Sequence, residues 1–136
     1  VTLTDTGPLV ALVNRNDPNH ARTLEATKRL PAGRLLTTWP CFTEAMYLLL
    51  RAGGYPAQAV LWRWRTDGRL LLYDLTPAEI DRMAELMGKY RDKPMDLADA
   101  SLVAAAERLD APQVFTLDAD FHVYRLAQGS TLEIVP

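Results

Sequence analysis

The chain has 136 residues, of which 49% are hydrophobic and 24% are charged, and these proportions are typical of one globular domain. Its formal net charge of −2 excludes a general nucleic-acid coat protein, which needs a strongly basic surface. The single cysteine, Cys41, excludes an internal disulfide and suits a reducing compartment, and no apolar run is long enough to span a membrane. No basic and apolar leader is visible, so we expect no export signal and predict a single cytoplasmic domain over residues 1–136.

Short apolar strands alternate with helices along the whole chain. Strands are expected at residues 1–5, 34–38, 69–75, 113–117 and 132–135. Helices are expected at about 8–14, 16–30, 40–53, 56–67, 76–90 and 96–110, with a short one from about 120. Strands separated by helices indicate a mostly parallel sheet with helices on both faces. The sequence therefore predicts an α/β fold with three layers, α/β/α.

Proline, glycine and capping residues set these helix boundaries. Pro18, Pro40 and Pro56 suit the first turn of a helix, and Gly53-Gly54 suits the end of one. The segment Thr76-Pro77-Ala78-Glu79 has the spacing of a capping box, in which each side chain binds the other residue's backbone N–H. Each expected helix thus has a residue type that favours its start or its end.

Two aspartates lie at the carboxyl ends of expected strands. Asp5 closes "VTLTD" and Asp118 closes "VFTLD". In open α/β sheets, ligands bind at this edge, outside the carboxyl ends of the strands. Aspartate is also a favoured turn and cap residue, so either one taken alone is equally well explained by local structure.

Glu44 is the only charged residue between Trp39 and Leu50, and it lies within a helix rather than at its end. A carboxylate in such an apolar segment is costly to bury unless it is paired, hydrogen-bonded or bound to a metal. The alternative is that Glu44 is favoured by the helix dipole, because it falls near the first turn.

Asp96 and Asp99 lie at the front of the segment "MDLADASLVAAAERLD", whose body has the composition of a helix buried on most of its surface. They are three residues apart and could form a capping pair, with Asp96 as the N-cap. We expect Asp96 to cap this helix and Asp99 to face a functional site, with the buried helix as its rigid mount.

Four carboxylates from separate segments therefore form a candidate constellation: Asp5, Glu44, Asp99 and Asp118. If they converge, their repulsion favours a bound cation, and hard ions such as Mg²⁺ or Mn²⁺ prefer oxygen ligands. No His–Cys cluster for zinc, no phosphate-binding GxxxxGK[ST] loop and no GxSxG nucleophile motif competes with this interpretation.

The sequence resembles the PIN-domain ribonucleases and, among them, the VapC-type toxins of toxin–antitoxin systems. Four segments carry the resemblance in the same order and spacing: "DTGPLVAL", "TEAMYLL", "DLADASLVAAAERL" and "TLDADF". The first two are weak motifs by themselves, whereas the last two together are fairly specific. The resemblance extends over nearly the whole chain and implies a PIN-like domain.

The resemblance implies metal-dependent hydrolysis of RNA phosphodiester bonds, leaving a 5′-phosphate and a 3′-hydroxyl. It assigns the metal-binding and catalytic roles to Asp5, Glu44, Asp99 and Asp118, with Mg²⁺ or Mn²⁺ as cofactor. Supporting positions are Thr6, Asp96, Thr116 and Asp120. His20 also matches a family position, but packing or capping at the start of its helix explains it equally well. A cognate antitoxin and a homodimer are the implied protein partners.

RNA binding beside acidic residues requires flanking basic groups, for which the candidates are Arg15, Arg22, Arg91, Lys93 and Arg125. The segment "LWRWR" also combines aromatic and basic residues. Trp64 falls on the apolar stripe formed with Ala57, Val60 and Leu61, so we expect it in the core. Trp62 falls off this stripe, and we favour a dimer or antitoxin contact for it over stacking on RNA.

Two other functions are compatible with parts of the sequence. A catalytically silent PIN-like binding module is one, although all four acidic positions are filled. Another Mg²⁺-dependent phosphoryl hydrolase is the second, because Asp118-Ala119-Asp120 is similar to the DxD motif of haloacid-dehalogenase phosphatases. That motif normally follows the first strand, whereas this one lies near the carboxyl end of the chain.

Overall fold

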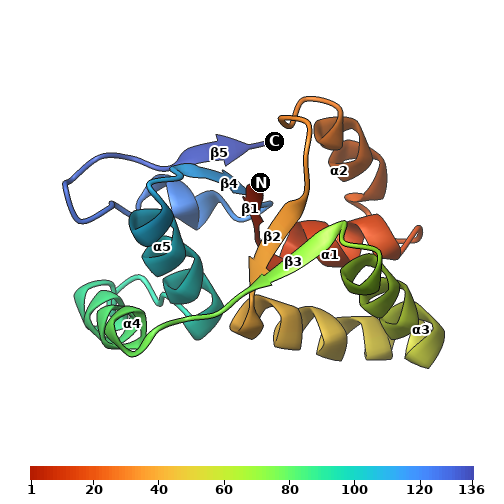
Figure 1. Cartoon of the computed structure of the whole chain (residues 1–136), viewed down its shortest axis with the longest axis horizontal. Coiled ribbons are helices and arrows are strands. Elements are labelled where there is room, and N and C mark those ends of the chain that lie inside the picture. Colours follow the sequence, from red (N-terminus) through yellow and green to blue (C-terminus); the bar gives the residue numbers. More distant parts are fainter.

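A computed structural model describes residues 1–136 and contains one five-stranded sheet. Its strands are β1 (Thr2–Thr4), β2 (Leu35–Thr38), β3 (Leu70–Tyr73), β4 (Gln113–Phe115) and β5 (Glu133–Val135). The strand order is β3-β2-β1-β4-β5, and every neighbouring pair is parallel. The predicted parallel sheet is therefore confirmed, and β1 lies at its centre (Figure 1).

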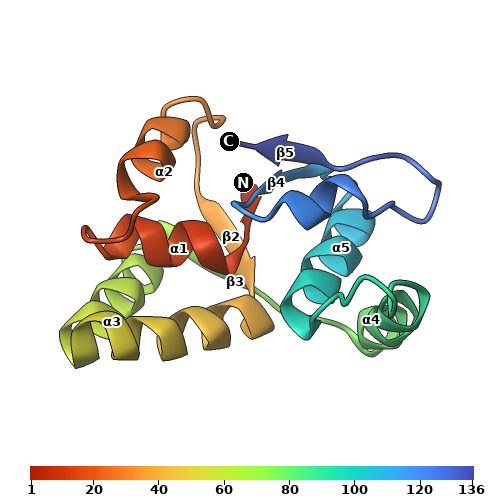
Figure 2. The same ribbon diagram turned by 180° about the vertical axis from the view of Figure 1, so that it is seen from behind.

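Helices cover both faces of this sheet, as Figures 1 and 2 show. On one side lie α4 (Pro77–Lys89) and α5 (Leu97–Leu109), together with the short helix η1 (Ala119–His122). On the other side lie α1 (Thr6–Val13), α2 (His20–Thr27) and α3 (Trp39–Thr66). The α/β/α arrangement expected from the alternation of strands and helices is confirmed.

Each side of the sheet has its own hydrophobic core. Every residue of α5 from 98 to 106 is buried, so this helix is enclosed on most of its surface, as its Ala-rich composition predicts. The opposite core joins α1 and α3 through Leu9, Phe42 and Leu49. Leu61 is fully buried and Trp64 packs beside it, whereas Trp62 is 45% exposed and touches Phe42 edge-on at 5.1 Å between ring centroids.

Three helix boundaries differ from the sequence-based expectation. The first helix begins at Thr6 rather than Pro8, because the Asp5 side chain caps it by accepting from the Thr6 N–H. The second helix begins at His20 rather than 16, because the Asp17 carboxylate accepts from the Asn19 N–H and holds a turn there. The helices expected at 40–53 and 56–67 form one element, α3, that is kinked at Gly54, where φ is 69°.

The strands are also shorter than predicted, by one to three residues each. The capping box at Thr76 and Glu79 is present as predicted. No helix of the structure is both long enough and apolar enough to cross a membrane.

Candidate functional site

A cavity of about 360 Å³ opens at the carboxyl ends of β1 and β4. These strands are neighbours, with Leu3 opposite Val114 and Thr4 opposite Phe115. The structure brings all four predicted carboxylates to its wall, each from a different segment. The lining residues are Asp5, Thr6, Gly7, Val10, Asp17, Asn19, Glu44, Leu48, Asp96, Asp99, Leu117 and Asp118.

Asp5 is the most firmly held of these carboxylates and is 7% exposed. Its Oδ1 accepts from the Thr6 N–H at 2.8 Å, and its Oδ2 accepts from the Thr116 hydroxyl at 2.7 Å. The buried Cys41 thiol lies 3.8 Å from the same Oδ1 and 3.7 Å from the Ala98 carbonyl oxygen. Cys41 thus belongs to the hydrophobic core and also lies against the site.

Asp96 and Asp99 form the expected capping box at the start of α5. The Asp96 Oδ1 accepts from the Asp99 N–H at 2.7 Å, and the Asp99 Oδ2 accepts from the Asp96 N–H at a longer 3.4 Å. The buried Tyr124 hydroxyl also donates to the Asp99 Oδ2, at 3.1 Å. Both aspartates line the cavity, so capping and facing the cavity are not alternatives here.

Asp118 follows β4 and caps η1, where its Oδ1 accepts from the Asp120 N–H at 2.9 Å. The Thr116 hydroxyl accepts from the Asp118 N–H while it donates to Asp5, and so it joins the two strand ends. Asp120 does not line the cavity, and its carboxylate lies 3.8 Å from the Lys93 ammonium.

Glu44 reaches the cavity from α3 and makes no hydrogen bond or ion pair. Its side chain is exposed, so the expectation that burial makes this carboxylate costly is wrong. The apolar neighbours that suggested burial lie on other faces of the helix, with Ala45 and Leu49 in the core. The helix turns Glu44 away from that core and toward the carboxylates at the strand ends.

Three of the cavity's carboxylates are N-caps, namely Asp5 for α1, Asp96 for α5 and Asp118 for η1. In a parallel sheet, a helix that follows a strand begins at the strand's carboxyl end, as α1 and η1 do after β1 and β4, and α5, which follows α4, brings its N-terminus to the same cavity. A helix N-terminus stabilises negative charge, which explains why the fold tolerates several acidic groups here.

The local environment raises the pKa of two of these carboxyl groups. Burial raises the pKa of Asp5 to about 6, and the nearby Asp118 and Asp96 carboxylates act in the same direction, against the hydrogen bonds from Thr116 and Thr6. Burial, followed by repulsion from Asp96 and Asp5, raises the pKa of Asp99 to about 8. Since no Lys or Arg lines the cavity, these carboxylates have no basic partner at its wall.

The donor set suits a hydrated divalent cation better than a fully enclosed one. No three His, Cys, Asp or Glu side chains lie close enough together to form a complete metal-binding cluster. Mg²⁺ and Mn²⁺ are commonly bound by one or two carboxylates, and waters or substrate phosphate complete the shell. Glu44, Asp99 and Asp118 each keep a carboxylate oxygen without a hydrogen-bond partner, so the residues fit such an ion.

The sequence did not point to Asp17, Asn19 or Tyr124. Asp17 and Asn19 line the cavity from the turn before α2, in a segment where the sequence predicts the start of a helix. His20 lies outside the cavity, and its Nδ1 is 2.7 Å from the Ala11 carbonyl oxygen at the end of α1. That contact gives a hydrogen-bond partner to a carbonyl at the helix end, and it supports a packing or capping role for His20.

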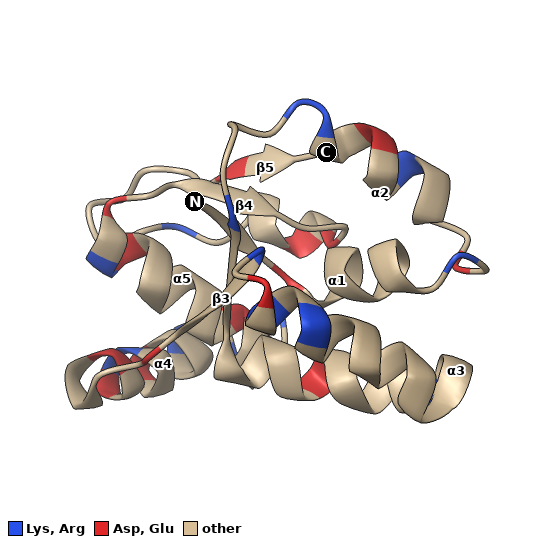
Figure 3. Ribbon diagram, turned by 45° about the vertical axis from the view of Figure 1, so that its right-hand side comes forward, with Lys and Arg blue, Asp and Glu red and all other residues tan.

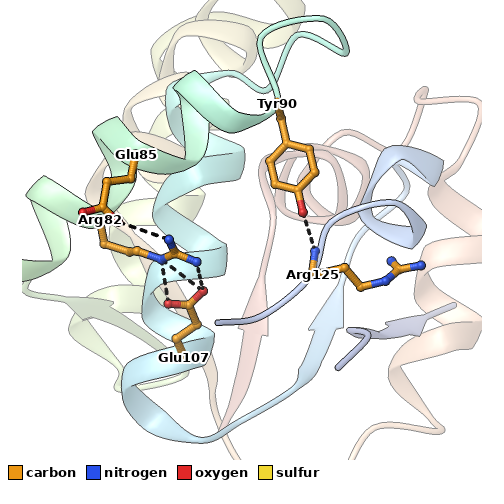
Figure 4. A network of polar contacts seen from close by, with 5 residues as sticks. All are labelled: Arg82, Glu85, Tyr90, Glu107 and Arg125. Carbon is orange, nitrogen blue, oxygen red and sulfur yellow. Dashed lines mark hydrogen bonds and ion pairs between the residues drawn. The ribbon is translucent and has the colours of Figure 1, made fainter. Parts of the chain in front are cut away.

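The basic candidates lie outside the cavity wall. The Arg125 guanidinium donates to three backbone carbonyls of residues 122–124, and its backbone N–H donates to the Tyr90 hydroxyl at 2.9 Å (Figure 4). Basic and acidic residues are distributed over α2, α3, α4 and α5 rather than gathered on one basic face, and α1 carries none (Figure 3). Any RNA contact by these side chains stays a prediction.

Comparisons with known proteins extend over the whole fold. The sequence matches the PIN domain family over residues 2–126. Ribonuclease VapC26 of Mycobacterium tuberculosis is 29% identical over 133 residues, which cover 97% of this chain and 98% of that protein. The crystal structure of M. tuberculosis VapC20, a sarcin–ricin loop cleaving toxin, matches with a TM-score of 0.84 at 18% identity and covers both chains fully. A chain of a toxin–antitoxin complex from Klebsiella pneumoniae matches with a TM-score of 0.66 at 16% identity, covering 89% of this chain and 90% of that one.

The family match includes the strand ends, the helix starts and all four acidic positions described above. The structural matches independently support the same fold, because their sequences are too different for identity alone to reveal it. The resemblance carried by the four sequence motifs is therefore confirmed, and the chain belongs to the PIN-domain family.

Proposed function

We propose that this protein is a divalent-metal-dependent endoribonuclease and the toxin of a toxin–antitoxin pair. One observation carries the proposal: in a PIN-domain chain, four carboxylates from separate segments line one cavity that contains no basic side chain. The full-length similarity to a VapC ribonuclease supports RNA as the substrate. We expect the protein to act in the cytoplasm, where its RNA substrate is made.

Among Asp5, Glu44, Asp99 and Asp118, one or two carboxylates would bind Mg²⁺ or Mn²⁺ directly and the others through its bound waters. A bound ion supplies an activated water at neutral pH and offsets negative charge on the reacting phosphate. The chain's own residues keep the carboxylates in place: Thr116 and Thr6 hold Asp5, and the capping box orients Asp99. None of these roles needs a side-chain nucleophile, and no serine, cysteine or histidine lines the cavity.

For the partners, we propose an antitoxin that brings an Arg or Lys side chain to the acidic cavity. Such a side chain would offset the same excess charge as the metal ion does, and would exclude the ion by occupying its place. A homodimer remains our expectation for the toxin itself. The half-exposed Trp62 is our candidate for a dimer or antitoxin contact, since an exposed indole beside Phe42 favours a protein partner.

The test measures RNA cleavage by the purified wild type with Mg²⁺ or Mn²⁺ and with EDTA, and by the purified Asp5→Asn variant with the same metals. We expect metal-dependent cleavage by the wild type and none by the variant. A silent binding module instead predicts no cleavage with any metal and unchanged partner binding by Asp5→Asn. Mapping the ends of total cellular RNA after brief induction would identify the target.

A further inference from the structure

Tyr124 is the largest fully buried side chain of the protein, yet its hydroxyl points to a carboxylate of the cavity. The hydroxyl donates to the Asp99 Oδ2 at 3.1 Å, and the whole residue is 0% exposed. Tyr124 itself does not line the cavity, so it contacts the site from behind. A buried tyrosine hydroxyl needs a hydrogen-bond partner, and here the partner is a proposed metal ligand 25 residues away in the sequence.

The Tyr124 ring is fixed on two sides by other aromatic rings. Tyr90 at the end of α4 and Phe121 in η1 contact it edge-on, at 5.1 Å and 5.2 Å between centroids. The next residue is tied down as well, because the Arg125 N–H donates to the Tyr90 hydroxyl (Figure 4). With its ring and backbone both held, Tyr124 presents its hydroxyl from one position.

Because of this contact, the two carboxylate oxygens of Asp99 have different surroundings. The Oδ2 receives the Tyr124 hydroxyl and the weaker Asp96 N–H, whereas no hydrogen bond reaches the Oδ1. The segment that carries Tyr124 also carries Asp118 at the start of η1. A single stretch of chain thus provides one carboxylate of the cavity and orients another.

We propose that Tyr124 is a positioning residue that holds Asp99 by one oxygen so that the other is free to bind the metal ion. This inference rests on the proposed function, since it requires a divalent ion in the cavity. Hydrogen-bond donors behind a metal ligand commonly change metal affinity by about 10–100-fold when they are removed. The alternative is that Tyr124 only fills the core, in which case its hydroxyl would not affect metal binding.

The experiment compares Tyr124→Phe with Tyr73→Phe by calorimetric titration of the intact protein with Mn²⁺. Both variants keep their rings and lose one hydroxyl, but only the first loses a contact with Asp99, and Tyr73 in β3 does not line the cavity. We expect Tyr124→Phe to weaken Mn²⁺ binding about 10-fold and Tyr73→Phe less than 2-fold. In an Asp99→Asn background, Tyr124→Phe should have no further effect on Mn²⁺ binding, because the group it positions is gone.

Thermal unfolding of the metal-free variants, with circular dichroism, checks that both are folded. Unchanged Mn²⁺ affinity in folded Tyr124→Phe would overturn the positioning role while leaving the nuclease proposal intact. An equal loss in the Asp99→Asn background would also overturn it, because the effect would then not pass through Asp99. If the wild type binds no Mn²⁺, the proposed function fails first and this inference fails with it.

Discussion

The helix α5 carries two carboxylates whose surroundings are opposite in kind. Near its end, Glu107 is held by Arg82 of α4, whose Nε and Nη2 donate to the two carboxylate oxygens at 3.0 Å each (Figure 4). Near its start, Asp99 has no basic partner and receives only a tyrosine hydroxyl and a backbone N–H. One helix therefore holds both a neutralised acid and an unneutralised one.

The pKa values follow this difference. The pKa of the Arg82 guanidinium is raised, first by its hydrogen bonds to Glu107, because each charge stabilises the other. Burial, followed by repulsion from the Asp96 and Asp5 carboxylates, raises the pKa of Asp99 to about 8, and the hydrogen bonds from Tyr124 and the Asp96 N–H offset this rise only in part. An acid paired with a base within the chain keeps its charge at little cost, whereas a buried carboxyl group without a basic partner is harder to ionise.

The largest expected difference between the two ends of α5 is in catalysis. We expect Asp99→Asn to reduce RNA cleavage by about 100-fold or more, because it removes a charge that stabilises the metal-bound transition state. The matched control, Glu107→Gln, should stay within about 2-fold of the wild type. Initial rates of RNA cleavage with saturating Mg²⁺ measure both, and full activity of Asp99→Asn would remove Asp99 from the site.

The next expected effect is the pH dependence of metal binding. Since protons compete with the ion for Asp99, whose pKa is about 8, and for Asp5, whose pKa is about 6, Mn²⁺ affinity should rise from pH 6 to pH 8. Each titrating carboxylate contributes up to about tenfold per pH unit. Glu107→Gln should keep this slope and Asp99→Asn should flatten it, as titrations at several pH values would reveal. A slope independent of Asp99 contradicts the assignment.

Without metal, the two substitutions should change stability in opposite directions at pH 8. Asp99 has a folded pKa above its unfolded one, so the native state loses stability as pH rises through the range from about 4 to about 8. Asp99→Asn removes that loss and should raise the melting temperature in EDTA at pH 8. Glu107→Gln breaks a pair with Arg82 and should lower the free energy of unfolding by about 1–2 kcal/mol. Differential scanning calorimetry at pH 5 and pH 8 tests both signs.

The smallest expected effect concerns the geometry of the ion pair. Arg82→Lys keeps the positive charge but cannot donate to both Glu107 oxygens in the same planar arrangement. We expect a loss of about 0.5–1 kcal/mol in the free energy of unfolding and no change in Mn²⁺ affinity. Urea denaturation measures the first and calorimetric titration the second. A changed Mn²⁺ affinity would mean that the two ends of α5 are coupled.

Much of the fold could be predicted from the sequence, because local sequence patterns favour the same elements that the tertiary structure contains. The alternation of apolar strands and capped helices predicted the parallel sheet, and the strand ends placed Asp5 and Asp118 at one edge. The spacing of Asp96 and Asp99 predicted their capping box. These features depend on residues close to one another in the chain or on the general geometry of parallel sheets.

The features that could not be predicted from the sequence depend on contacts between segments that are distant along the chain. Glu44 looked buried in sequence, and only the packing of α3 shows which of its faces is exposed. Asp17 lies in a segment predicted to be helical but forms a turn at the cavity wall. Tyr124 was unremarked, since its hydrogen bond to Asp99 is not encoded in any local pattern.

The order of these parts along the chain has a consequence for the cell that makes the protein. Asp5 is synthesised early, but β4, Asp118 and Tyr124 all come from the final quarter of the sequence. Because β4 inserts between β1 and β5, the wall of the cavity beside Asp5 is absent until that segment has left the ribosome. A nascent chain therefore cannot complete this cavity until β4 and η1 have been made, although most of its other elements have already been translated.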